Sequence, residues 1–309
     1  MTVHKGLIYC SCRAVAVLLL AASLYYLAFN FEWREAISLL KRADRLLLLG
    51  GGALATILFC ALRALRWSLM LRGHGLRVPY MRVLHVTTVS LGFSVVTPLQ
   101  SGELLKVEWL TRNGMLDRRR GYGTFAVEKV MDLAVALLIG IAGLSLFPWQ
   151  LPHVAWWVPA LLAGGVGLAH VLWKSLSPQW RKAALAMLAG AGTGWQMTRF
   201  LLLTVCIWGA LALGWYCSLA SIGVDLSAWQ AFVLLAWVAL IGIASMIPGS
   251  VGIAEVSVAG ILAGWGVDLV SAHAAALAMR LFSVILLAIG AGAYFAGLVF
   301  KAIWGLRRT

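Results

Sequence analysis

Residues 83–110 read VLHVTTVSLGFSVVTPLQSGELLKVEWL, two apolar pieces that a proline and a glycine interrupt in the middle. A second stretch, residues 229–263, is interrupted in the same way at Ile247-Pro248-Gly249-Ser250-Val251-Gly252. Inside a bilayer, the backbone groups that such a break frees must be buried in protein or face a wet cavity. We therefore predict two re-entrant helical hairpins, with helix breaks at Pro98, Gly102, Pro248, Gly249 and Gly252.

The rest of the chain has the composition of a membrane protein. Of its 309 residues, 62% are hydrophobic and the mean hydropathy is +0.92, whereas soluble domains are about 45–50% apolar. A helix needs about 20 apolar residues to cross a bilayer. Six runs approach that length: Val15–Phe29, Leu46–Leu62, Leu133–Phe147, Val154–Trp173, Leu201–Ala220 and Ala274–Phe300. We predict an all-α integral membrane protein of six full spans plus the two hairpins, forming one domain over residues 1–309.

The basic residues favour a membrane orientation rather than a nucleic-acid partner. The formal net charge is +14, and the cations concentrate in residues 63–82, 112–120, 174–199 and 301–308. The connections 148–153, 221–227 and 264–271 contain neither Lys nor Arg. We assign Arg63 and Arg66 to the first basic loop. This distribution follows the positive-inside rule and predicts cytoplasmic N- and C-termini in a bacterial inner membrane. One loop is ambiguous, because Asn30–Arg45 must then lie outside and yet carries Arg34, Lys41, Arg42 and Arg45.

The two broken stretches share a spacing of charged residues. Glu103 precedes Glu128-Lys129 by 25 and 26 residues, and Glu255 precedes Arg280 by 25. Broken helices that occur twice, in opposite orientations, are typical of secondary transporters, whose sites lie where the breaks meet. We predict an inverted repeat with one copy at about 46–147, a linking span at 154–173 and the second copy at about 201–300.

Ionisable residues at membrane depth form the candidate site, because a charge there needs a partner or a task. They are Glu103, Lys106, Glu128, Lys129, Asp132, Glu255 and Arg280. Two interpretations stay open: the acids pair with the cations and lock the helices together, or they line a cavity for a charged head group. The cysteines and histidines lack metal-ligand spacing and no nucleotide-binding GxxxxGK[ST] motif occurs, so we expect neither metal nor other cofactor.

These motifs resemble those of a known family. The segment Pro98–Glu103 is similar to the family's P-x-x-x-G-E signature, and Glu128–Asp132 is similar to its E-R-x-x-D signature. The segment Pro248–Glu255 is similar to its P-G-x-x-G-x-x-E signature, and Arg280 lies where the family's late span carries an arginine. The family is the flippase-like transmembrane domain of lysylphosphatidylglycerol synthases, and the resemblance covers residues 46–300. It implies lipid translocation. Two differences are Lys129, where arginine is usual, and the lack of an aminoacyl-transferase domain, so we expect no lysyl-lipid synthesis by this chain.

We hypothesise a flippase or scramblase, not an enzyme, that moves a phospholipid or a polyprenyl- or isoprenoid-linked lipid. Lys106, Lys129 and Arg280 would contact a head-group phosphate, and neutralising Glu128 or Glu255 would abolish transport without unfolding the protein. Membrane lipids with an anionic or lipid-linked head group are the expected partners, besides a second copy or a partner synthase. The alternatives are an integral-membrane transferase acting on a lipid-linked substrate and a scaffold subunit for a lipid- or glycan-synthesis enzyme.

Overall fold

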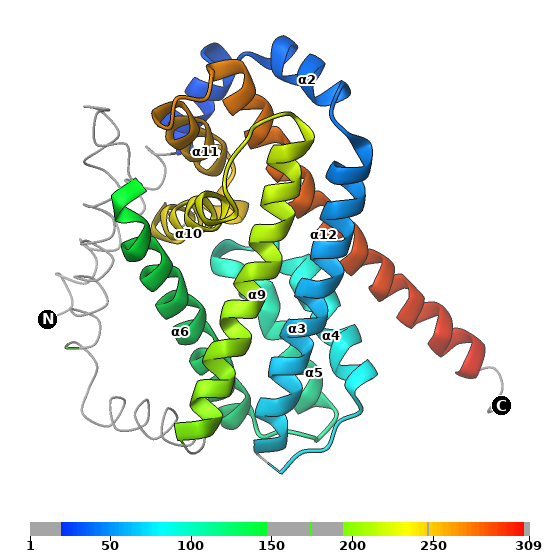
Figure 1. Cartoon of the computed structure of the whole chain (residues 1–309). Coiled ribbons are helices and arrows are strands. Elements are labelled where there is room, and N and C mark those ends of the chain that lie inside the picture. Colours follow the sequence, from blue (N-terminus) through cyan, green and yellow to red (C-terminus); the bar gives the residue numbers. More distant parts are fainter. Residues whose placement is uncertain (1–19, 74, 147–173, 175–193, 246, 306–309) are drawn as a thin grey trace, which may run out of the picture.

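The structure, a computed structural model, describes residues 20–73, 75–146, 174, 194–245 and 247–305 (Figure 1). This part of the chain contains helices and no strands, and five of the helices are long and apolar enough to cross a membrane. These candidate spans are Leu46–Gly73, Arg118–Leu146, Trp195–Ser221, Ala228–Ser245 and Leu269–Leu298. The all-α membrane class is therefore confirmed. The predicted span Val154–Trp173 lies outside the described residues, as does the start of Val15–Phe29, which continues as a helix over Leu20–Phe29.

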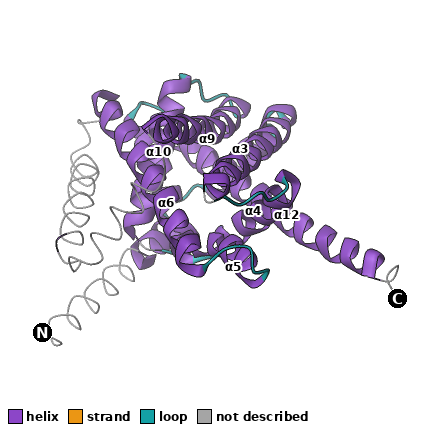
Figure 2. Ribbon diagram, turned by 90° about the horizontal axis from the view of Figure 1, so that it is seen from below, coloured by secondary structure: helices purple, strands orange, loops and turns teal. Residues whose placement is uncertain are grey.

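The helices follow one another with short connections. After Leu20–Phe29 they are α2 (Trp33–Lys41), η1 (Leu46–Gly51), α3 (Gly52–Gly73), α4 (Tyr80–Ser94), η2 (Pro98–Leu104), α5 (Leu105–Arg112), α6 (Arg118–Ala142), η3 (Gly143–Leu146), α9 (Gly194–Ser221), α10 (Ala228–Ser245), η4 (Pro248–Ser250), α11 (Ile253–Gly264) and α12 (Leu269–Gly305). Figure 2 shows α3 beside α9 and α4 beside α12, and both pairs are in contact.

Both predicted breaks interrupt the α-helical backbone. Thr97 is extended, as expected for a residue before proline, and Pro98 opens the 3₁₀ turn η2. In the second break Gly249 and Gly252 have φ values of 60° and 83°, which a residue with a side chain rarely adopts. Each break therefore lies where the sequence predicts it.

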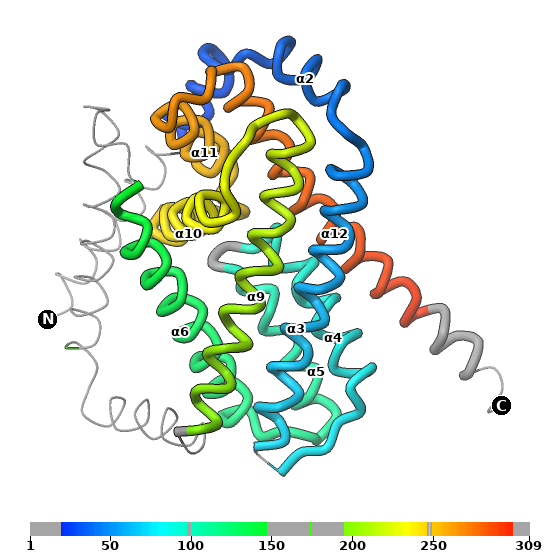
Figure 3. The backbone as a smooth tube through the Cα atoms, in the orientation of Figure 1, coloured from blue at the N-terminus to red at the C-terminus, as the bar shows by residue number. Residues whose placement is uncertain are grey.

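The two hairpins turn back at these breaks and meet. The α4–η2–α5 hairpin leaves from the end of the molecule at which it enters, and α10–η4–α11 does the same at the opposite end (Figure 3). η2 and η4 are in contact. With 15 and 8 residues, α4 and α5 are too short to span about 30 Å of hydrocarbon. The hairpin shape is as predicted, whereas the inverted-repeat relationship stays a prediction.

Helix α10 differs from the prediction. It was predicted as a short half of a hairpin, yet its 18 residues are enough to cross a membrane. Figure 1 shows it almost end-on, crossing the direction of α9. In its apolar stretch 56% of the residues are buried, against 33–44% in the other four spans, and Trp237 donates a hydrogen bond to Gly140 O of α6 (3.0 Å). α10 is thus the most buried of the five candidate spans among the described residues.

The connections fall into two sets at opposite ends of the molecule. The turns after α3 and α5 and the start of α9 lie at the lower end in Figure 1, while α2 and the turns before α10 and α12 lie at the upper end. Among the described residues, the lower set carries Arg72, Arg77, Arg112, Arg118, Arg119, Arg120 and Arg199. Which end faces the cytoplasm stays a prediction.

Labelling with a membrane-impermeant maleimide tests this orientation. Asn113 and Asp225 are exposed residues of opposite ends. We expect Asp225→Cys, in a cysteine-free background, to be labelled on intact spheroplasts and Asn113→Cys only after the membrane is opened. The reverse result would invert the predicted topology.

Candidate functional site

Two arginines of α3 form the centre of a buried ion-pair network. Arg63 and Arg66 are three residues apart, which places them on one helix face, and both are buried. Their assignment to a cytoplasmic loop was wrong, because α3 continues to Gly73 and carries them into the protein interior. The signal that could have found them is their helical spacing at the end of an apolar run.

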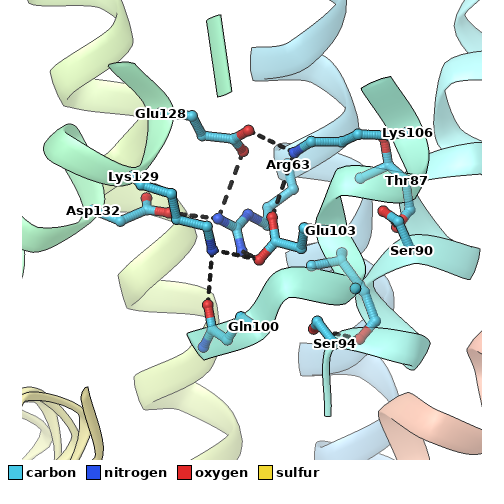
Figure 4. A network of polar contacts seen from close by, with 12 residues as sticks. Arg63, Thr87, Ser90, Ser94, Gln100, Glu103, Lys106, Glu128, Lys129 and Asp132 are labelled. Atoms are coloured by element: carbon cyan, nitrogen blue, oxygen red, sulfur yellow. Dashed lines mark hydrogen bonds and ion pairs between the residues drawn. The ribbon is translucent and has the colours of Figure 1, made fainter. Parts of the chain in front are cut away.

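Three carboxylates surround the two guanidinium groups, and Figure 4 shows the carboxylates around Arg63. Arg66 pairs with Glu128 (Nη2–Oε1, 2.8 Å) and with Asp132 (Nη1–Oδ1, 2.7 Å), one helical turn further along α6. Arg63 pairs with Glu103 of η2 (Nη1–Oε1, 3.0 Å) and also with Asp132. Arg66 Nη1 also donates to Thr204 Oγ1 of α9 (2.6 Å). The network therefore joins α3, η2, α6 and α9.

Two lysines complete the network, and they differ in accessibility. Lys106 of α5 is buried against the Trp67 ring (4.5 Å from Nζ to the centroid) and pairs with Glu128 and Glu103. Lys129 Nζ contacts Glu103 Oε1 (2.7 Å), and its side chain is 26% exposed. Lys129 is thus the outer member of the network, while Lys106 is an inner one.

The network holds more positive than negative charge. Four cationic side chains, Arg63, Arg66, Lys106 and Lys129, face three carboxylates, those of Glu103, Glu128 and Asp132, which leaves one positive charge in excess. Buried charges are tolerated only when they are paired and hydrogen-bonded. Ion pairing by the predicted acids is thus shown, and one positive charge of the network has no carboxylate within the network to balance it.

A second cluster lies on α11 and α12. Arg280 of α12 contacts Glu255 of α11 through Nε (2.7 Å) and Nη2 (2.6 Å). Arg280 also donates to the carbonyl oxygens of Gly249 (2.8 Å) and Ser250 (3.3 Å) in η4. The second Glu255 oxygen accepts the N–H of Gly252 (2.9 Å), so this carboxylate caps the start of α11 and positions the arginine. The Arg280 side chain is 28% exposed.

The two breaks repeat one arrangement. Lys129 binds both Glu103 and the Gln100 side chain of η2 (Nζ–Oε1, 2.8 Å), as Arg280 binds both Glu255 and the η4 backbone. Gln100 and Ser250, each two residues after the proline, have φ values of 55° and 50° and are the non-glycine residues with positive φ in the described ranges. Such backbone strain is concentrated at functional sites. Each break therefore holds one partly exposed cation.

The face of α4 beside the network is polar. Figure 4 shows Thr87, Ser90 and Ser94 along this helix, next to η2 and Lys106. The two serine hydroxyls donate to carbonyl oxygens of their own helix, and all three side chains are buried. The polar surroundings of the ion pairs thus extend along the first hairpin.

Residues 13–291 match the family described as the lysylphosphatidylglycerol synthase TM region. The chain belongs to this family. The match confirms the resemblance drawn from the motifs and extends it toward the N-terminus, because it includes the first helix and α2. A comparison with curated proteins finds no match.

The family motifs correspond to the two clusters rather than to a single site. Five of the seven predicted site residues, Glu103, Lys106, Glu128, Lys129 and Asp132, gather around the α3 arginines, while Glu255 and Arg280 form the second cluster. Contact between η2 and η4 links the clusters. Lys129 stands where the motif resemblance predicts an arginine. It reaches both Glu103 and Gln100 with one ammonium group but lacks the bidentate fork of a guanidinium.

Proposed function

We propose that this protein moves a lipid with a phosphate-bearing head group between membrane leaflets, as a flippase or scramblase. The observation that carries the proposal is the pair of partly exposed cations, Lys129 and Arg280, each bound to one of two helix breaks that touch. Charge-assisted hydrogen bonds to a phosphate are stronger than those between neutral groups. The excess positive charge of the first network favours the same ligand.

In this proposal the remaining charged residues position the two cations. Glu103 and Glu255 hold Lys129 and Arg280 at the breaks. The α3 arginines hold Glu103, Glu128 and Asp132. Lys106 changes role relative to our hypothesis from the sequence: because it is buried and paired with two carboxylates, it supports the site instead of contacting the phosphate. The lipid tails would stay in the bilayer while the head group passes the polar junction. Broken helices also form the substrate sites of secondary transporters.

The proposal includes a location and an energy source. Membrane-spanning helices and the family support a multi-pass membrane protein, and we propose the bacterial inner membrane with the basic end of the molecule in the cytoplasm. Net movement would be driven by a lipid gradient or by protons. No chemical change of the lipid is part of the proposal.

Removing either exposed cation tests the proposal. We expect Lys129→Gln and Arg280→Gln, reconstituted in liposomes with fluorescent phosphatidylglycerol, to move the lipid about 10–100-fold more slowly than the wild type. The factor corresponds to the loss of one charged hydrogen bond, about 1.5–3 kcal/mol. The measurement is the rate at which dithionite, added outside, bleaches the lipid that starts in the inner leaflet.

Matched controls separate the site from general charge effects. Arg118→Gln removes one surface cation and is expected to leave the rate unchanged, since this side chain pairs with Glu108 outside the network. Lys129→Arg keeps the charge and is expected to retain transport. Equal rates for Lys129→Gln, Arg280→Gln and the wild type would show that both cations are structural. A wild type that moves no lipid but chemically modifies a lipid-linked substrate would favour the transferase. Lipid movement that appears only when a second protein is present would favour the scaffold.

A further inference from the structure

A second buried polar group lies where α2 covers the start of α12, away from the ion pairs. The His273 side chain of α12 is completely buried, and its ring stacks on Phe31 with 4.1 Å between centroids. Its Nε2 atom is 3.0 Å from Tyr26 Oη of the first helix. Its Nδ1 atom accepts the backbone N–H of Glu32, the residue before α2 (3.3 Å). His273 of α12 thus contacts the first helix and the start of α2 across 247 and 241 positions of the sequence.

These contacts define the protonation state of the ring. Because Nδ1 accepts a hydrogen bond, a neutral His273 must carry its proton on Nε2, which then donates to Tyr26 Oη. A second proton would have to bind Nδ1. There it would face the N–H of Glu32, and two donors cannot share a hydrogen bond. Protonation of His273 therefore requires the contact between α12 and the start of α2 to change.

The carboxylate of Glu32 can accept the new proton's hydrogen bond. Its Oε2 atom is buried and has no hydrogen-bond partner among the described residues. A buried carboxylate oxygen without a partner is costly, and an imidazolium N–H would satisfy it and balance its charge. If Glu32 rotates, the hydrogen bond from its backbone N–H to His273 Nδ1 is lost. The protonated Nδ1 of His273 then donates a hydrogen bond to Glu32 Oε2.

The other acidic groups near this end of α12 have partners or face solvent. Asp44 accepts the N–H groups of Leu46 and Leu47, and Asp268 accepts that of Ser271. Glu255 of α11 pairs with Arg280, and Glu35 of α2 is exposed. Glu32 is therefore the acid best placed to stabilise a charged His273.

We propose that His273 and Glu32 form a proton-binding site, and that proton binding shifts α12 against α2. His273 precedes Arg280 by seven residues, two helical turns, so both lie on the same side of α12. A movement of α12 at His273 therefore reaches the arginine that holds the second break. The role of the proton as the coupling ion for lipid movement rests on the function proposed above, whereas proton binding itself does not.

Nitrogen NMR of the imidazole rings tests proton binding directly. The protein is labelled with ¹⁵N-histidine in lipid nanodiscs, titrated from pH 8 to pH 4.5, and the His273 signal is assigned by its loss in His273→Gln. We expect Nδ1 to change from an acceptor to a protonated signal within this range. Glu32→Gln should weaken proton binding about tenfold, moving the midpoint down by about one pH unit.

Tyr26→Phe is the matched control. The tyrosine faces the nitrogen that keeps its proton in both states, so its loss is expected to move the midpoint much less than Glu32→Gln. A His273 signal that stays neutral down to pH 4.5, or a midpoint that Glu32→Gln leaves unchanged, would overturn the proposal.

The lipid assay at pH 5.5 and pH 7.5 tests the coupling separately. We expect the wild-type rate to differ between the two pH values and the His273→Gln rate to be the same at both. If His273 titrates but the wild type and His273→Gln respond to pH alike, the proton is not the coupling ion. A wild type without lipid movement at either pH would contradict the proposed function, and the NMR titration would still decide whether the proton site exists.

Discussion

Replacing Glu128 by glutamine is expected to lower the free energy of unfolding by about 3–5 kcal/mol, the usual cost of removing one partner from a buried ion pair. Glu128 is completely buried and faces Arg66 at 2.8 Å, with Lys106 and Arg63 on its other sides. Without the carboxylate these cations lose a partner at membrane depth, where water cannot replace it. Thermal and denaturant unfolding of the protein in detergent micelles measures the loss.

Two further variants make this result specific. Glu108→Gln removes a carboxylate of the same size from the exposed pair with Arg118, and we expect little change in stability. Adding Lys106→Gln to Glu128→Gln should recover part of the loss, because both partners of one pair are then neutral. If Glu128→Gln unfolds like the wild type, water reaches the network and the desolvation argument is wrong. The sequence led us to expect that neutralising Glu128 spares folding; its burial in the network gives the opposite expectation.

Gly102→Ala is expected to cause the second large loss of stability, about 1–3 kcal/mol or more. A Cβ atom at Gly102 would lie 2.6 Å from the backbone atoms Phe93 C and Ser94 N, so η2 would have to move away from α4. The contacts are with backbone, which cannot rotate away as the end of a side chain can. The displacement would also pull Glu103, the next residue, out of the network. The same unfolding measurements check this expectation.

Gly260→Ala is the control for this substitution. Nothing lies within 4 Å of a Cβ atom at Gly260, in the middle of α11, so alanine there should leave stability unchanged or raise it by about 0.5–1 kcal/mol. If Gly102→Ala and Gly260→Ala have the same stability, the close approach of η2 to α4 is not required for the fold.

The sequence by itself determined the class of the protein, the position of both breaks and the family. Apolar runs and proline–glycine interruptions act through local backbone chemistry, so Pro98 and Pro248 could be placed without knowledge of packing. The charged residues that a bilayer makes costly were equally visible, and all seven predicted site residues are paired in the described structure.

Only the tertiary structure decided which charges meet. Arg63 and Arg66 follow an apolar run, and the sequence alone does not show whether the helix ends before them or continues past them. The structure shows that α3 continues to Gly73, so both arginines belong to the helix. The division of the site into two clusters, and the contact of His273 with Tyr26 across 247 positions, depend on how distant helices pack. The physical reason is that breaks and spans follow from neighbouring residues, whereas ion pairs and hydrogen bonds between helices follow from the complete packing of the chain.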